Sequence, residues 1–313
     1  MSKPQVVTVL AGGDSPERDV SLTSGRDVYK ALHELGVPVR LLEIQDLEDL
    51  RQHLSDIEIA FSCLHGGAGE DGTIQRILEN HRIPYAGSGP EASALGMDKL
   101  ATKRVLTSVG VPVPRALAFK DADLDSAAQE VIRNFSLPVV VKPQSQGASI
   151  GVKRVDTPDK LIPVCAGVLE EFGPFFVEEF IAGRELTVPV LWMDGRDHVL
   201  PIVEVFITTD FFDYETKYTD GLNSMVVPAL LDNDVKARVE DATLKTHQAL
   251  GCWGFSRVDI LLTAEGVPYV LETNTLPGMT PHSAMPKSAA AIGIDYPHLV
   301  EKMVTSPLKR PMK

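Results

Sequence analysis

Three oxygen-bearing side chains are spaced closely near the C-terminal end of the sequence. Asp259 follows Arg257 in one apolar run, and Glu272 and Asn274 end the next. If the two runs pair as a hairpin, carboxylate and amide oxygens meet with no cysteine or histidine beside them. Such hard oxygen ligands suit Mg²⁺, which commonly bridges carboxylates and nucleotide phosphates. A glycosidase acid–base pair is the alternative, but it leaves Lys142 and the loop after it unexplained.

Lys142 and Lys99 are candidate phosphate contacts. Lys142 ends the apolar run L-P-V-V-V-K-P, where an ammonium group is costly unless an anion meets it. The following Q-S-Q-G-A-S-I-G has small residues whose N–H groups can close over phosphates, although it is not a Walker A loop. A flexible hairpin tip with a lysine extending to solvent is the alternative for this segment.

Two glycine-containing turns follow apolar runs in the N-terminal part. The first, after Gly12 and Gly13, lacks G-x-G-x-x-G and carries Glu17, which would repel a pyrophosphate. Glu17 therefore either favours a helix dipole or faces a substrate ammonium. The second turn, C-L-H-G-G-A-G-E-D-G, ends a predicted parallel strand, where ligands bind in open α/β sheets. His65 in this turn is either structural or part of a site.

The elements that must position these residues change character along the chain. Strand and helix signals alternate at first, which predicts an α/β fold with a doubly wound parallel sheet. From about residue 96 the pattern breaks, and strands at 139–142 and 152–155 predict a hairpin. Further strands, a helix near 234–250 and a second hairpin follow. We therefore predict three regions: 1–95, 96–183 and 184–313.

Composition narrows the class of protein. The net charge of −13 disfavours nucleic acid and anionic membrane as partners. No apolar run approaches the roughly 18 residues of a membrane-spanning helix, and the start does not resemble a signal peptide. The three cysteines are odd in number and widely spaced, which argues against a disulfide framework. We expect a protein of the reducing cytoplasm.

Eight motifs together resemble one known family. They are G-G-D-S-P-E-R-D-V-S, H-G-G-A-G-E-D-G, S-G-P-E-A-S-A-L-G-M-D-K, V-V-K-P, E-E-F-I-A-G-R-E, D-Y-E-T-K-Y, G-F-S-R-V-D and E-T-N-T-L-P-G-M-T-P-H-S. Their order resembles that of the D-alanine–D-alanine ligases, which are ATP-grasp enzymes, over nearly the whole chain. The resemblance implies an N-terminal α/β domain followed by a two-domain ATP-grasp fold. It also implies ligation of two D-alanine molecules through a D-alanyl phosphate, with release of ADP and phosphate, for peptidoglycan precursors. A homodimer is the family expectation.

By motif position, the resemblance implies an ATP site made of six residues: Lys99, Lys142, Ser149, Glu178, Ile181 and Glu185. The lysines would contact phosphates, Glu178 and Ile181 would flank adenine, and Glu185 would accept from the ribose hydroxyls. Three further residues would hold Mg²⁺ or Mn²⁺: Asp259, Glu272 and Asn274.

The resemblance also implies an amino-acid site. Glu17 would pair with the ammonium of the first D-alanine, with His65 nearby. Arg257 and the Gly278 backbone would stabilise the oxyanion. The carboxylate of the second D-alanine would meet Ser283 and Lys217, with Ala284 beside them. Tyr218 would lie on a loop, Thr208 to Ser224, that closes the site and excludes water from the acyl phosphate.

The sequence departs from the family pattern at three positions. Ala148 stands where a serine is usual, Ala284 where a larger apolar residue is common, and Gly67 where arginine is frequent. The first change puts in doubt a hydroxyl link between Glu17 and Tyr218. These departures leave two other functions open: a ligase whose second substrate is D-serine or D-lactate, and a nucleotide-binding protein without ligase turnover. Tyr218 argues against the depsipeptide-forming relatives, and the intact metal and oxyanion residues argue against the second.

Overall fold

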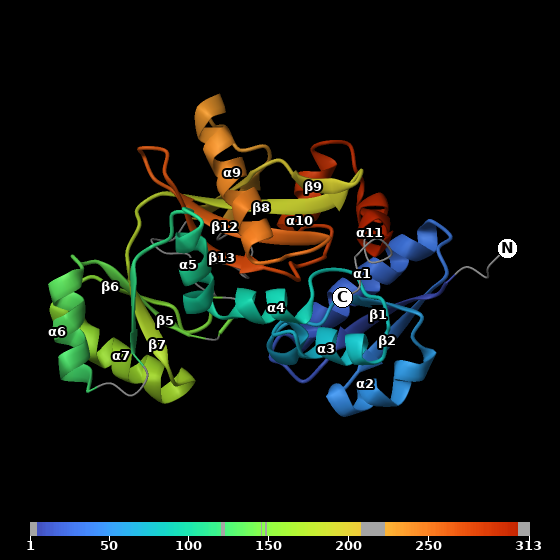
Figure 1. Cartoon of the computed structure of the whole chain (residues 1–313), viewed down its shortest axis with the longest axis horizontal. Coiled ribbons are helices and arrows are strands. Elements are labelled where there is room, and N and C mark those ends of the chain that lie inside the picture. Colours follow the sequence, from blue (N-terminus) through green and yellow to red (C-terminus); the bar gives the residue numbers. More distant parts are fainter. Residues whose placement is uncertain (1–4, 120–122, 145, 148, 208–222, 306–313) are drawn as a thin grey trace.

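The computed structural model describes residues 5–119, 123–144, 146–147, 149–207 and 223–305. Three sheets, each with its own helices, make up this part of the chain (Figure 1). Each sheet falls inside one of the three predicted regions, whose boundaries at 95 and 183 stay predictions. No helix in the described ranges has the length and apolarity that a membrane crossing requires.

The N-terminal sheet is parallel and doubly wound, as predicted. Its strands β1 (Val7–Gly12), β2 (Val39–Ile44) and β3 (Ile59–Ser62) have the order β2-β1-β3. Val7 and Val9 pack with helix α1 (Arg18–Glu34) on one face. Leu10, on the other face, packs with helices α2 (Leu47–His53) and α3 (Thr73–Asn80). Short 3₁₀ turns lie at Leu54–Asp56 and Gly67–Gly69. Alternation along β1 thus sends successive side chains to two cores.

The central sheet is antiparallel, with strand order β4-β7-β5-β6. Its strands are β4 (Ala116–Phe119), β5 (Val139–Pro143), β6 (Lys153–Val155) and β7 (Phe175–Glu179). The pairing of β5 with β6 confirms the predicted hairpin. Val139, Val141 and Val177 face a core with helices α6 (Leu124–Asn134) and α7 (Pro158–Phe172). Because side chains alternate, Lys142 and Glu178 face the opposite side.

The C-terminal sheet is the largest and has the order β11-β10-β8-β12-β13, with β9 paired to β8. Its strands are β8 (Arg184–Met193), β9 (Arg196–Val199), β10 (Val203–Ile207), β11 (Asn223–Val226), β12 (Phe255–Leu262) and β13 (Pro268–Asn274). Helix α9 (Asn233–Ala249) covers one face with Val239, beside Leu106 of helix α5 (Lys99–Ser108). The opposite face of this sheet is not covered by α9 and is available for a site.

Two connections hold the three parts together. Helices α4 (Pro90–Met97) and α5 lead from the N-terminal sheet toward the other two (Figure 1). At the C-terminal end, helix α10 (Ala284–Ala290) is followed by α11 (Tyr296–Thr305), and Leu299 and Met303 pack in one core with Val28 and Leu32 of α1. The last helix therefore buries its apolar side against the first. The three cysteines are free and buried.

Candidate active site

A cavity of about 1060 Å³ is lined by residues from all three parts of the chain: strands of the central and C-terminal sheets, and helix α1 and the turn after β3 in the N-terminal part. Fifteen of the seventeen predicted site residues contribute to its wall: Glu17, His65, Lys99, Lys142, Ser149, Glu178, Ile181, Glu185, Arg257, Asp259, Glu272, Asn274, Gly278, Ser283 and Ala284. The other two, Lys217 and Tyr218, lie outside the described residues, as do Ala148 and most of the predicted closing loop. Segments separated by up to about 270 residues thus meet at one cavity.

The hairpin of β12 and β13 presents the three predicted metal ligands on one face. Asp259 is directly opposite Glu272, and Arg257 is opposite Asn274. Because cross-strand partners share a face, their side chains project together toward the cavity. Buried Val258 and Ile260, which alternate with them, point into the core under α9. Strand alternation therefore explains why acidic side chains sit in an apolar run.

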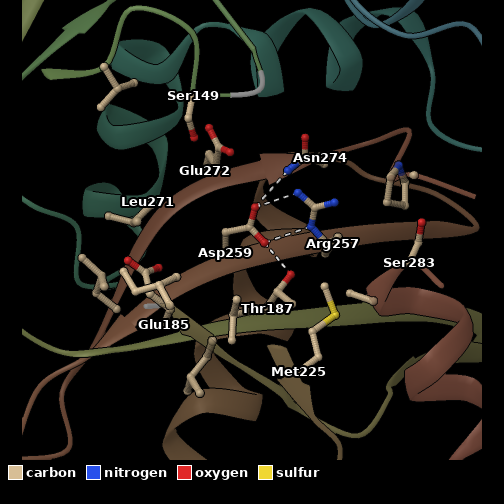
Figure 2. A pocket seen from close by; sticks show the side chains of 18 of the residues that line it. Ser149, Glu185, Thr187, Met225, Arg257, Asp259, Leu271, Glu272, Asn274 and Ser283 are labelled. Atoms are coloured by element: carbon tan, nitrogen blue, oxygen red, sulfur yellow. Dashed lines mark hydrogen bonds and ion pairs between the residues drawn. The ribbon is translucent and has the colours of Figure 1, made fainter. Parts of the chain in front are cut away.

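Asp259 is held by neighbours on three strands (Figure 2). Arg257 donates to both its oxygens, at 2.9 Å from Nε and 2.8 Å from Nη2. Thr187 on β8 donates at 2.5 Å, and Asn274 donates through Nδ2 at 3.2 Å. Arg257 and Asp259 therefore form a bidentate pair, and the contacts from Thr187 and Asn274 further hold the carboxylate in place.

Negative charge accumulates around this hairpin. Glu185 lies on β8, and burial raises its pKa to about 7; the carboxylate of Asp259 and, more weakly, that of Glu272 act in the same direction, while Lys142 opposes them. Lys99 Nζ is 3.5 Å from Glu272 Oε2. Two carboxylates and an amide oxygen on one face fit a hard divalent cation. Among the described residues, no cluster of three His, Cys, Asp or Glu side chains offers a metal site, so this set depends on the amide of Asn274.

A buried charge cluster closes the side of the cavity formed by the central sheet. Glu178 is 2% exposed and pairs with Lys142 and with Lys103, whose Nζ is 2.8 Å from Glu178 Oε2. Lys103 also donates to the Pro114 carbonyl at 3.0 Å. Burial alone would raise the pKa of Glu178, but the two ammonium groups outweigh it and hold that pKa below its ordinary value. Sequence reasoning missed Lys103, which lies one helical turn after Lys99.

Apolar side chains lie next to this cluster and form a wall suited to a flat ring. They come from three strands and the segment after β7: Val140, Phe180, Ile181, Leu261 and Leu271. Figure 2 shows Glu185 and Leu271 at one end of the pocket and Ser283 at the other, with Asp259 and Arg257 between them. The cavity is therefore apolar at one end and polar at the other.

The two glycine turns of the N-terminal domain meet at the polar part. Ser15 Oγ donates to the His65 carbonyl at 2.5 Å and accepts from the Glu17 N–H at 3.2 Å. Gly66 has φ of 70°, a conformation that favours glycine, and a Cβ there would lie 3.0 Å from Glu17 Oε2. Both the backbone conformation and the lack of space therefore favour glycine at this position. His65 Nδ1 is 3.4 Å from Glu70 Oε1, whereas its buried Nε2 has no hydrogen-bond partner within the described structure.

Ser283 begins helix α10 on the opposite wall. Its Oγ is 2.9 Å from Thr280 Oγ1, and a Cβ on Gly278 would lie 3.2 Å from that same oxygen. The absence of a side chain at Gly278 thus keeps its backbone close to the Ser283 hydroxyl. A backbone N–H, a hydroxyl and the guanidinium of Arg257 together offer donors for anionic oxygens.

Comparison with known proteins agrees with this geometry. Family models described as D-ala D-ala ligase N-terminus and D-ala D-ala ligase C-terminus match residues 40–88 and 105–305. The chain is 43% identical over 299 residues to a D-alanine–D-alanine ligase of Desulforudis audaxviator, covering 95% of this chain and 97% of the relative. A similar ligase of Moorella thermoacetica is 40% identical over 302 residues, with 95% and 97% covered.

Solved structures show the same similarity. The D-alanine–D-alanine ligase of Bacillus anthracis complexed with ATP superposes with a TM-score of 0.84 at 35% identity, covering 98% of both chains. The VanG D-Ala:D-Ser ligase of Enterococcus faecalis also reaches 0.84, at 29% identity, covering 97% of this chain and all of that one. The similarity thus extends over the three sheets and the cavity between them.

Proposed function

The chain belongs to the D-alanine–D-alanine ligase family, and we propose that its cavity binds ATP and two D-alanine molecules and joins the amino acids. The observation that carries this proposal is the convergence of fifteen of the predicted site residues, from all three parts of the chain, on one cavity. The products are D-alanyl-D-alanine, ADP and phosphate. The homodimer and the cytoplasmic location remain predictions from the sequence.

We assign the apolar end to the nucleotide. Lys103 contacts Glu178 Oε2 and Lys142 contacts Oε1; because a carboxylate oxygen has a second lone pair, Oε1 would also accept from the amino group of adenine beside Ile181. Lys142 and Lys99, which line the cavity, would meet the phosphates, and Glu185 would accept from the ribose hydroxyls. Ser149, with φ of 61°, sits in the glycine-containing loop that would cover the phosphates. These groups position ATP with its terminal phosphate toward the polar part of the cavity.

Asp259, Glu272 and Asn274 would hold Mg²⁺, since their oxygens suit that ion and share one sheet face. When bound, Mg²⁺ supplies positive charge that offsets the negative charge of the phosphate oxygens. Lys99 already touches Glu272, so the residues for phosphate and for metal are adjacent.

The reaction then has two steps. An oxygen of the first D-alanine carboxylate attacks the terminal phosphorus of ATP, and the bond to ADP breaks, which gives an acyl phosphate. The amine of the second D-alanine attacks the acyl carbon, and phosphate leaves the tetrahedral intermediate. Glu17 binds the first ammonium group near His65. Arg257 and the Gly278 N–H stabilise the oxyanion, and this electrostatic stabilisation is the main contribution of the chain to the rate.

The test measures the amounts of phosphate and dipeptide formed and compares them. Purified protein with ATP, Mg²⁺ and D-alanine should release one phosphate per D-alanyl-D-alanine, both measured, whereas L-alanine should support neither. D-Serine and D-lactate, each supplied with D-alanine, test the sibling activities by mass analysis of the products. Glu17→Gln should lose dipeptide formation, while the exposed Glu43→Gln serves as control. Phosphate release without dipeptide, or a dominant mixed product, would overturn the proposal.

A further inference from the structure

The cationic side chains that line the cavity differ in whether they contact a carboxylate. Five Lys or Arg side chains line the cavity in the described part of the chain, and four of them contact a carboxylate: Lys99 with Glu272, Lys142 with Glu178, Arg184 with Glu204, and Arg257 with Asp259. The fifth, Lys287, has no carboxylate partner among the described residues. Its Nζ meets only the thioether of Met225, at 3.9 Å.

Lys287 is held in an environment that does not satisfy its charge. The side chain is half-buried, so it cannot be fully hydrated. A thioether sulfur is a weak acceptor, and an ammonium group has three donors. Withdrawing an ammonium from water without a counter-charge is unfavourable, which leaves the site prepared for an anion.

Helix α10 is held in place around Lys287, and this limits the positions that the ammonium group of Lys287 can reach. Lys287 lies one helical turn after Ser283 on α10, and its N–H donates to the Ser283 carbonyl at 3.2 Å. Ser288 Oγ donates to the Pro201 carbonyl at 2.5 Å, and Met285 and Ala289 are fully buried. Residues four apart on a helix share a face. The ammonium of Lys287 and the hydroxyl of Ser283 therefore project from the same side of α10 toward the cavity.

The position of Lys287 identifies which anion it would meet. The candidate phosphate contacts lie on α5 and β5 and the candidate metal ligands on the hairpin of β12 and β13, whereas Lys287 lies on α10 and touches β11. The carboxylate Glu17, placed for an ammonium group, comes from the N-terminal domain. The remaining anionic group of the substrates is the carboxylate of the second amino acid, for which Ser283 is the candidate hydroxyl.

We propose that Lys287 is a substrate-binding residue that pairs with the carboxylate of the second amino acid and selects acceptors that carry one. This inference rests on the proposed function and adds a residue to it. Lys217, predicted for the same carboxylate, lies outside the described residues. Lys287 acts on acceptor binding and takes no part in phosphoryl transfer.

The experiment compares Lys287→Met and Lys287→Arg with the parent protein. D-Alanine binds as both substrates, and steady-state kinetics over a wide concentration range separates the two KM values. A charge-assisted hydrogen bond in a partly exposed setting predicts a KM for the second D-alanine roughly tenfold higher in Lys287→Met. The KM values for the first D-alanine and for ATP should be unchanged, and Lys287→Arg should retain most of the affinity. Lys245→Met, an exposed lysine on α9, is the control.

D-Alaninamide provides the chemical control because it lacks the acceptor carboxylate. With D-alanine held at a concentration that fills only the first site, Lys287→Met should leave kcat/KM for D-alaninamide unchanged, so the preference for D-alanine falls about tenfold. An equal loss for both acceptors would show a structural role and overturn the inference, as would a selective rise in the KM for ATP. If the parent forms no dipeptide, the proposed function fails; a Lys287→Met variant equal to an active parent refutes this inference alone.

Discussion

Replacing Lys103 by methionine should destabilise the protein because it leaves a buried carboxylate with half its compensation. Glu178 is 2% exposed and lies between Lys103 and Lys142. Lys103 is itself 6% exposed, and burial lowers its pKa although Glu178 acts in the opposite direction. Methionine is close to lysine in length and shape, so the substitution removes charge with little change in packing.

The expected magnitude follows from burial. Removing one partner of a buried ion pair costs about 3–5 kcal/mol. Lys142 still contacts Glu178, so we expect a loss near the lower value, about 3 kcal/mol. The matched control is Lys245→Met, which breaks a pair with Asp241 of nearly equal length, 2.7 Å against 2.8 Å, but with both side chains at least half exposed. An exposed pair four residues apart on a helix contributes only about 0.3–0.5 kcal/mol.

Urea denaturation followed by circular dichroism at pH 7 measures both variants, and the double variant Lys103→Met/Glu178→Gln tests the cause. If the loss comes from an uncompensated charge, the double variant is more stable than the sum of the single losses predicts. The pKa of Glu178 is depressed, so stability from its ionised form is present above its ordinary pKa and lost as pH falls through the folded value. The difference between parent and Lys103→Met should therefore shrink in acid. Equal losses in Lys103→Met and Lys245→Met would refute the reasoning.

Three further outcomes are expected. Glu272→Gln should abolish turnover and remove the Mg²⁺-dependent part of ATP binding in calorimetry; turnover at the parent rate would contradict the metal assignment. Gly25→Ala should destabilise by about 1–3 kcal/mol, because the new Cβ would lie 2.5 Å from Ala11 Cβ, whereas Gly167→Ala, with open space around it, should stabilise by up to about 1 kcal/mol; the two unfolding midpoints decide. Ser15→Ala should raise the KM for the first D-alanine severalfold without changing that for ATP, because Ser15 links the turns carrying the first-substrate residues.

Part of the candidate site was predictable because its signals are local, whereas residues such as Glu178 and Ser283 were predicted only through the family resemblance. A polar side chain at the end of an apolar run, such as Lys142 or Glu272, is unusual wherever it occurs. The pairing that makes these residues a site was not predictable from periodicity. In β12 and β13 the register shifts after Asp259, and this irregularity brings Leu271 to the cavity wall. The packing of α11 on α1 likewise joins segments more than 250 residues apart, for which the sequence contains no local signal.

Lys103 and Lys287 were both missed because a lysine on a helix is ordinarily a solvated residue. On α5, however, Lys99, Lys103 and Leu106 are spaced i, i+4 and i+7, which is the inward-facing stripe of a packed helix. Leu106 is fully buried. Because Lys99 and Lys103 lie on the same stripe of the helix as Leu106, both lysines also face the interior. On α10 the same inference starts from buried Ala284, which lies three residues before Lys287 and shares its face of the helix. A lysine in register with core residues of its own helix therefore indicates a buried anion, either a carboxylate as at Glu178 or a substrate group as we propose for Lys287.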